Sequence, residues 1–221
     1  MNRYVLFVFT SALFFGAGTA LAQPSSDRDG TWDFGIAMID QSSETLDGQQ
    51  GSTLDIAGRL GWGITAMYNL NDHLALGLDF GWNRPNYEAT RIVEDPMGPD
   101  TVRTKLDMFS YEFKGAYHLI DGPLTPFIEA SAGWTNMDSN IPDGPPISGC
   151  WWDPWWGYIC DSFYSTYSKT RFSYGGALGL RFDTPNGIGI KGSYGIKEID
   201  TSNATESASF EVWKLELLWQ F

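Results

Sequence analysis

The chain has 221 residues, of which 27 are acidic and 14 are basic, so its formal net charge at pH 7 is −13. Such an excess of negative charge argues against a nucleic-acid-binding protein, because a phosphate backbone would repel it. Hydrophobic residues make up 43% of the chain, yet after the N-terminal region no window approaches the roughly 18 apolar residues that a transmembrane helix needs. The apolar residues alternate with polar ones instead, which indicates an all-β chain with many strands.

The first 22 residues have the pattern of a signal peptide. Arg3 supplies a short positive region, and an almost unbroken apolar stretch follows from Tyr4 to Phe15. Ala20-Leu21-Ala22 then has the small-x-small pattern of a signal peptidase site. We therefore expect a cleaved signal peptide over residues 1–22 and an exported, single-domain chain over residues 23–221.

Segments with the two-residue period of a β-strand follow one another along the mature chain. There are eight of them, at residues 32–39, 54–68, 73–83, 109–119, 128–134, 171–182, 188–197 and 211–221. In front of the fourth, the apolar residues between Val102 and Met108 run in the opposite phase. This reversal predicts a β-bulge near Met108 or an early end of the strand.

Short and long connections alternate between these segments. Residues 69–72, 120–123 and 183–187 are rich in residue types that favour tight turns. The longer connections are residues 41–53, 85–101, 138–169 and 200–206. In an up-and-down barrel, this alternation places every long loop at one rim and every short turn at the other.

The glycines and aromatic residues indicate which face of the sheet meets lipid. In a soluble lipocalin-type barrel, the apolar face would point inward around a ligand. Here the polar face is rich in glycine, which would weaken a solvated exterior but would make room in a narrow lumen. Aromatic residues on the apolar face gather near strand ends, as expected of rings at a membrane–water interface. These are Trp32, Trp62, Tyr68, Trp82, Tyr117, Trp134 and Trp219.

The charges on the polar face nearly balance, so buried charges there can pair with one another. The acidic ones are Asp33, Asp55, Asp79, Glu112, Glu129 and Glu216, and the basic ones are Arg59, Lys114, Arg171, Arg181, Lys191, Lys197 and Lys214. Only a closed barrel can present a sheet to hydrocarbon without leaving backbone groups unsatisfied. The expected fold is therefore all-β, an eight-stranded antiparallel up-and-down transmembrane β-barrel.

The stretches NLNDHLALGLDFGW and PFIEASAGW, together with the strand and loop pattern, resemble the small eight-stranded outer-membrane proteins, the OmpA/OmpX/OmpW-like β-barrel superfamily. The resemblance implies a monomer in the bacterial outer membrane, with its long loops outside the cell and its termini in the periplasm. Trp219 and Phe221 are similar to the C-terminal aromatic signal that the barrel-insertion machinery recognises. The other partners that it implies are outer-membrane lipid and lipopolysaccharide.

Charged side chains are expected to form a network in the lumen. The candidates are Arg59, Asp79, Glu112, Lys114, Glu129, Arg181, Lys191, Lys214 and Glu216. They have two interpretations. They could gate a narrow path for ions or small solutes, or they could plug the barrel, because eight strands leave space for little more than side chains.

The longest connection contains the unusual stretch GCWWDPWWGYIC. In an exported chain, Cys150 and Cys160 are expected to form a disulfide, and with no histidine nearby they do not suggest a metal site. The aromatic residues inside the ring offer a large contact area at a low entropic cost. They could bind an external glycan, lipopolysaccharide or a protein, or they could cover the barrel mouth or rest on lipid headgroups. They are Trp151, Trp152, Trp155, Trp156 and Tyr158.

Catalysis is not expected. Some barrels that this chain resembles modify lipid A with histidine, serine and acidic residues at the outer rim. Here the histidines, His73 and His118, flank short turns and have no partner placed for base chemistry. We therefore predict no catalytic residue, no metal and no cofactor, and a structural or cell-surface interaction role, with a narrow channel as the alternative.

Overall fold

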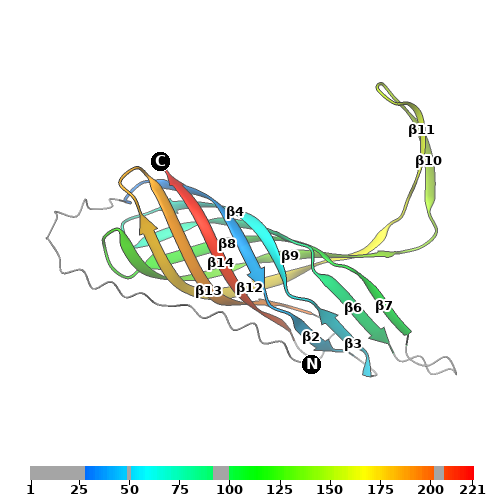
Figure 1. Ribbon diagram of the computed structural model, residues 1–221, viewed down its shortest axis with the longest axis horizontal. Helices are drawn as coiled ribbons and strands as arrows, with labels where there is room; N and C mark the ends of the chain where they lie inside the picture. The colour runs from blue at the N-terminus through cyan, green and yellow to red at the C-terminus, as the bar shows by residue number, and fades with distance from the viewer. Residues whose placement is uncertain (1–27, 49–50, 92–99, 202–206) are drawn as a thin grey trace, which may run out of the picture.

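The computed structural model describes residues 28–48, 51–91, 100–201 and 207–221. The expected signal peptide lies outside these residues. In the described part of the chain, the strands form a closed barrel, a four-stranded sheet and a two-stranded sheet (Figure 1). No helix in these ranges is long and apolar enough to cross a membrane.

The closed barrel has eight antiparallel strands, as predicted. Each barrel strand pairs with the next barrel strand along the chain, and the first closes on the last. At this seam the backbone N–H of Trp32 donates to Phe221 O (2.9 Å), and the N–H of Phe221 donates to Trp32 O (2.8 Å). The barrel strands are β1 (Trp32–Gln41), β4 (Arg59–Asn69), β5 (Leu74–Asn83), β8 (Asp107–His118), β9 (Leu124–Pro142), β12 (Thr166–Asp183), β13 (Ile188–Ile199) and β14 (Ala208–Gln220).

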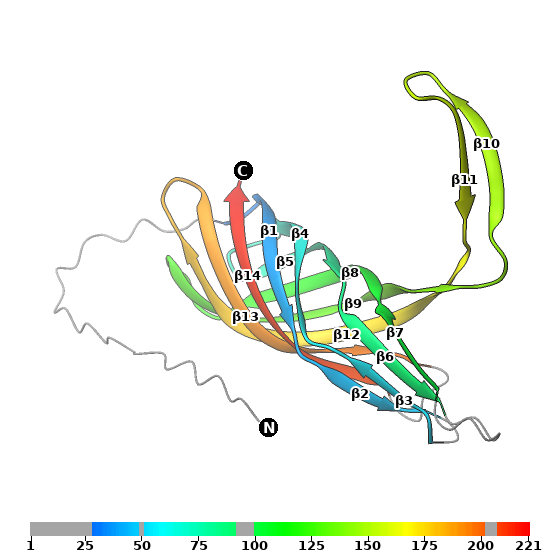
Figure 2. The same ribbon diagram turned by 45° about the vertical axis from the view of Figure 1, so that its right-hand side comes forward.

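The two ends of the barrel differ, as the alternating connections predicted. The turns between β4 and β5, β8 and β9, and β12 and β13 lie at one end, which also holds the start of β1 and the end of β14. We call it the turn end. The opposite end, which carries all the longer connections, is the loop end (Figure 2).

The connections at the loop end are more ordered than the sequence indicated. Two of them form a four-stranded sheet in the order β2-β3-β6-β7, built from β2 (Glu44–Asp47), β3 (Thr53–Ile56), β6 (Asn86–Arg91) and β7 (Asp100–Lys105). The expected strand 54–68 is therefore two strands, broken at Ala57 and Gly58. At the break, a Cβ on Gly58 would lie 2.9 Å from Gln41 O, so only glycine fits this close approach. Of the two outcomes predicted near Met108, the structure shows the early end and not the bulge. β7 ends at Lys105, Leu106 belongs to no strand, and β8 begins at Asp107.

Apolar side chains cover the outside of the barrel, as predicted. On β1, Phe34 and Ile36 are 48% and 53% exposed, whereas Asp33 between Trp32 and Phe34 is only 1% exposed. Ring contacts continue from strand to strand near the loop end, with centroid distances of 4.3 Å for Trp62–Trp82 and 5.7 Å for Tyr111–Trp134. Such a band of rings is typical of the level at which a transmembrane barrel meets the membrane–water interface.

Beyond this band, the apolar residues turn inward. On β14, Trp213 points outward, whereas Phe210 is buried inside and its neighbours Ser209 and Glu211 are exposed. The loop-end core that results consists of Leu46, Ile56, Leu106, Met108, Ile199, Ala208 and Phe210. The reversal of the alternation before residue 109 thus marks the level at which the strands leave the lipid: below it apolar side chains face outward, and above it they face the loop-end core.

The two-stranded sheet is a hairpin that stands away from the barrel (Figures 1 and 2). It consists of β10 (Ile147–Asp153) and β11 (Gly157–Phe163), and we call it the arm. Cys150 and Cys160 face each other across the two strands and form the predicted disulfide. The arm pairs with no other strand of the described chain, so the barrel does not depend on it.

We expect the double substitution Cys150→Ser and Cys160→Ser to leave the barrel intact. The disulfide closes a short ring with a sequence separation of 10, and its stabilisation of about 2–3 kcal/mol acts on the arm alone. The variant should insert into vesicles and keep the heat-modifiable gel mobility of the wild type. Loss of folding would show that the arm supports the barrel.

Candidate functional site

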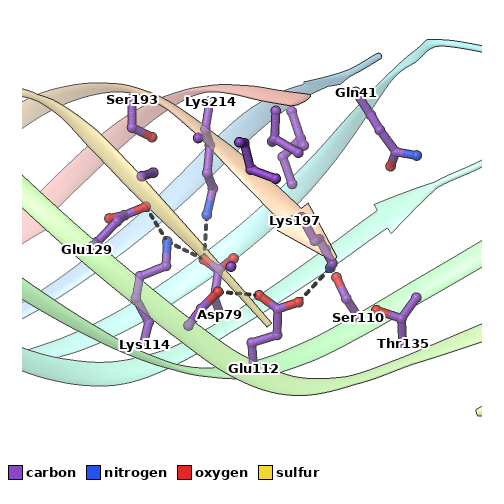
Figure 3. Close-up of a pocket in the computed structure, with 18 of the residues that line it drawn as sticks. Gln41, Asp79, Ser110, Glu112, Lys114, Glu129, Thr135, Ser193, Lys197 and Lys214 are labelled. Carbon is purple, nitrogen blue, oxygen red and sulfur yellow. Dashed lines mark hydrogen bonds and ion pairs between the residues drawn. The ribbon is translucent and has the colours of Figure 1, made fainter. Parts of the chain in front are cut away.

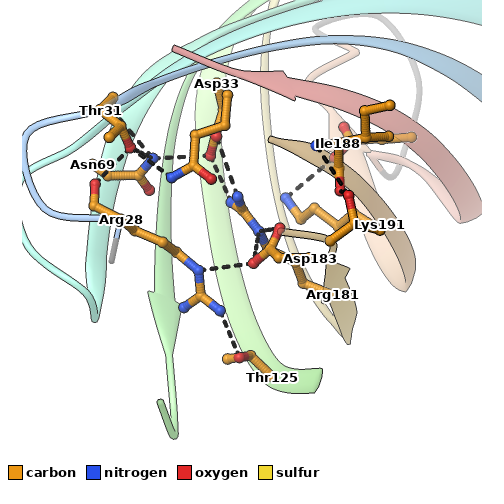
Figure 4. Close-up of polar contacts among 12 residues, drawn as sticks. Arg28, Thr31, Asp33, Asn69, Thr125, Arg181, Asp183, Ile188 and Lys191 are labelled. Carbon is orange, nitrogen blue, oxygen red and sulfur yellow. Dashed lines mark hydrogen bonds and ion pairs between the residues drawn. The ribbon is translucent and has the colours of Figure 1, made fainter. Parts of the chain in front are cut away.

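The lumen is closed at the turn end by a cluster of arginine and aspartate side chains, the turn-end plug (Figure 4). Arg28, which precedes β1, is completely buried and donates from Nε to Asp183 Oδ2 at 2.9 Å. Arg28 Nη2 also donates to Thr125 Oγ1 at 2.7 Å. Arg181 bridges Asp33 and Asp183, with Nη1 2.6 Å from Asp33 Oδ2 and Nε 2.8 Å from Asp183 Oδ1. Two arginines therefore neutralise two aspartates.

A middle cluster of three lysines and three carboxylates fills the centre of the lumen. Its members are Asp79, Lys114, Glu129, Lys191, Lys214 and Glu216. Glu216 contacts all three lysines, with its oxygens 2.7 Å from Lys214 Nζ, 3.3 Å from Lys191 Nζ and 3.5 Å from Lys114 Nζ. The buried charges compensate one another, as buried charges must.

Within the lumen, a further ion pair between described residues lies nearer the loop end (Figure 3). Lys197 Nζ is 2.6 Å from Glu112 Oε1. The hydroxyl groups of Ser131 and Ser173 also donate to Glu112, at 2.9 and 3.1 Å. These contacts satisfy the carboxylate without leaving a free charge in the lumen, so each of the three levels is neutral.

Most of the residues predicted to face the lumen take part in these clusters, but Arg59, Asp55 and Arg171 do not. Arg59 is exposed at the loop-end rim, and within the described ranges its side chain has no ion-pair partner. Asp55 lies in β3, outside the barrel, and accepts a hydrogen bond from Thr45 Oγ1 at 2.6 Å. Two members of the plug, Arg28 and Asp183, were not predicted. Asp183 keeps step with Arg181 and could have been found by extending that strand by one period.

The clusters leave little free space in the lumen. A cavity of about 100 Å³ lies between the middle cluster and the loop-end core and is lined by Lys214, Lys197, Met108 and Val212, among others. A second cavity, of about 10 Å³, lies between the middle cluster and the plug. Because a single water needs roughly 10–15 Å³, the second cavity has room for one water at most.

The exposed tip of the arm carries the aromatic residues that were predicted to bind a partner. Trp155 and Trp156 at the tip are 84% and 81% exposed. The tip turn is held by Asp153, whose Oδ1 accepts the backbone N–H of Trp155 (2.8 Å) and of Trp156 (2.9 Å). Gly157 closes the turn in a left-handed conformation, at φ 79°, which glycine adopts without strain. The remaining three, Trp151, Trp152 and Tyr158, are also exposed.

The histidines lie at the turn end, as predicted. His118 is buried and packs edge-on against the Phe127 ring. His73 lies on the surface, with Nδ1 2.9 Å from His118 O and Nε2 3.6 Å from Asp121 Oδ1. In the described part of the chain, no group of three or more His, Cys, Asp or Glu side chains could hold a metal ion.

An ion pair on the four-stranded sheet is solvent-exposed and contrasts with those in the lumen. Arg103 Nε and Nη2 donate to the two carboxylate oxygens of Glu88, both at 2.9 Å. These hydrogen bonds hold the pKa of Glu88 below its ordinary value. At an exposed site such a pair contributes little to stability, because water screens it.

A closed β-barrel with an apolar exterior and a charged interior defines an integral membrane barrel. The chain belongs to the outer membrane protein beta-barrel domain family, whose model matches residues 7–221. Its location is therefore the bacterial outer membrane. No curated protein sequence matches the chain.

Solved structures of small outer-membrane barrels are similar in fold. Neisserial surface protein A has 14% identity, with 87% of this chain and 98% of that chain covered and a TM-score of 0.49. OprG from Pseudomonas aeruginosa has 13% identity, with 88% and 97% covered and a TM-score of 0.49. Ail of Yersinia pestis, in complex with the heparin analogue sucrose octasulfate, has 14% identity, with 87% and 99% covered and a TM-score of 0.46. At these identities and TM-scores, none of the three bears on the function of this chain.

We expect Glu216→Gln to destabilise the barrel strongly. The change leaves three buried lysines with two carboxylates, and removing one partner of a buried ion pair costs about 3–5 kcal/mol. The measurement is the urea midpoint of unfolding in lipid vesicles, with the folded fraction read from gel mobility. As a control, Glu88→Gln removes one partner of the exposed pair with Arg103 and should leave the midpoint unchanged. Equal midpoints for wild type and Glu216→Gln would contradict a charged network.

Proposed function

We propose that this protein is a cell-surface interaction protein, in which a closed barrel anchors the arm in the outer membrane and presents its aromatic tip for binding. The observation that carries the proposal is the contrast between the two candidate sites. The lumen is filled by mutually neutralised charges, whereas the arm exposes the large indole rings of Trp155 and Trp156. Exposed aromatic residues of this kind are common at the centres of binding interfaces.

This function requires the loop end of the barrel to face the outside of the cell, because the arm leaves the barrel there. Outer-membrane barrels have short turns on the periplasmic side and longer loops on the outside. In this chain the three short turns share one end, and the arm leaves the barrel from the opposite end. An even number of strands also puts both ends of the barrel chain at the turn end, which would face the periplasm.

Transport of small ions or solutes is the second candidate function. The cavity of about 100 Å³, with Lys197 and Lys214 in its wall, favours it. A permeating ion would however have to separate the ion pairs of the middle cluster and of the turn-end plug. Lipid modification is a more distant candidate, since His73 and His118 lie at the turn end, away from the outer leaflet in this orientation.

We expect the refolded wild-type protein to show no steady conductance in planar bilayers. The ion pairs of Arg181 with Asp33 and Asp183 close the turn end, and separating such buried charges costs several kcal/mol. A steady open level that is lost in Glu129→Ala or Lys214→Ala would favour the channel function instead.

We expect cells that express the wild type to attach to coated wells through the arm. Wells coated separately with neutral glycans, lipopolysaccharide and phosphatidylcholine supply three chemical classes of partner. A variant with Trp151, Trp152, Trp155 and Trp156 all changed to Ala should lose the attachment that the wild type shows, because its apolar contact area is gone.

Orientation is checked in the same cells. A cysteine at Gly144, near the base of the arm, should react with an impermeant thiol reagent, whereas one at Asn186, in a turn-end turn, should not. The proposed function is excluded if no coated well shows attachment that depends on the four tryptophans, or if only Asn186→Cys is labelled.

A further inference from the structure

The tip of the arm is apolar on both faces of its sheet. Cross-strand pairing places Trp152 opposite Tyr158 on one face, and the next pair, Trp151 opposite Ile159, on the other. Trp155 and Trp156 lie in the turn that joins the two strands, where their backbone N–H groups donate to Asp153 Oδ1. A surface that docks side-on to a protein or a sugar needs one aromatic face, with the other free to be polar. A tip with rings all round is suited to immersion in an apolar phase.

Few polar groups are available beside these rings. The carboxylate of Asp153 accepts two backbone N–H groups through Oδ1, so its orientation is fixed by the tip turn. The other polar side-chain groups of the tip are the indole N–H groups and the Tyr158 hydroxyl. Binding sites for small ligands fix orientation with several converging polar groups, and this tip offers few of them. Indole and phenol rings with one wet edge are instead the side chains found at the membrane–water interface.

The charge of the arm selects among lipid surfaces. Residues 139–168 contain Asp143, Asp153 and Asp161 but no lysine or arginine. Segments that bind anionic lipids carry lysine and arginine near the surface. Lipopolysaccharide and other polyanions would repel this arm. A bilayer with zwitterionic headgroups imposes no such repulsion.

The arm is also braced for insertion. The Cys150–Cys160 disulfide and the hydrogen bond between Ser148 Oγ and Ser162 Oγ (3.0 Å) tie its strands together below the rings. A preorganised tip loses less conformational entropy on binding than a flexible loop. The arm projects clear of the barrel, so its tip can reach a second surface (Figures 1 and 2).

From this geometry we infer that the arm inserts its tip, Trp151 to Tyr158, into the headgroup interface of a zwitterionic phospholipid bilayer, a surface other than the lipopolysaccharide leaflet in which the barrel sits. The inference rests on the proposed function and names its partner. Burial of one large apolar side chain changes a partition coefficient roughly tenfold or more, so the two indoles at the tip dominate binding.

The test uses the full protein in nanodiscs, mixed with phosphatidylcholine or phosphatidylglycerol vesicles and separated by flotation. The wild type should float with phosphatidylcholine vesicles and severalfold less with phosphatidylglycerol vesicles. Trp155→Ala with Trp156→Ala should weaken binding to phosphatidylcholine at least about tenfold. Tyr164→Ala, an exposed aromatic residue at the base of the arm, is the matched control and should bind as the wild type does.

A charge change tests the choice of headgroup separately. Asp161→Lys should raise binding to phosphatidylglycerol and keep binding to phosphatidylcholine. Equal binding of the wild type to both vesicles would overturn the zwitterionic assignment. Absence of binding to phosphatidylcholine, together with tryptophan-dependent attachment to glycan-coated or lipopolysaccharide-coated wells, would overturn the lipid inference and leave the proposed function standing.

Discussion

Lipid on the outside of the sheet determines what the inside must contain. Barrel strands alternate between two surroundings, so every polar side chain of a lipid-spanning strand points into a narrow lumen. An uncompensated charge there would cost several kcal/mol. Each level is accordingly neutral, from Arg28 and Arg181 at the turn end to Lys197 and Glu112 near the loop end. The network that satisfies these charges also occupies the space through which a solute would pass.

This constraint explains why much of the fold could be predicted from the sequence. A period of two is a local signal, and it was sufficient to locate the barrel strands, the outward apolar face and most of the lumen charges. Glu216 and Lys214, for instance, are two residues apart on β14 and point into the same lumen. The short turns were equally local, because they depend on turn-forming residues. Cys150 and Cys160 were paired correctly since the described chain contains no other cysteine.

What could not be predicted depends on contacts between distant segments. Strands β2 and β6 lie in connections that looked irregular, and the separate sheet that they form with β3 and β7 was not foreseen, because outside the membrane the apolar residues are fewer and only tertiary packing reveals their phase. Arg59 keeps the lumen phase of β4 but lies at the rim, since alternation gives the direction of a side chain and not its depth. Arg28 precedes every strand, so no periodicity could place it in the plug.

The position of Arg28 has a consequence for assembly. The lumen is completed by a side chain that belongs to no strand, and without it Asp33 and Asp183 would share Arg181 alone. The turn end of the lumen is therefore fully charge-compensated only once Arg28, just ahead of β1, has joined it beside the seam of β1 and β14.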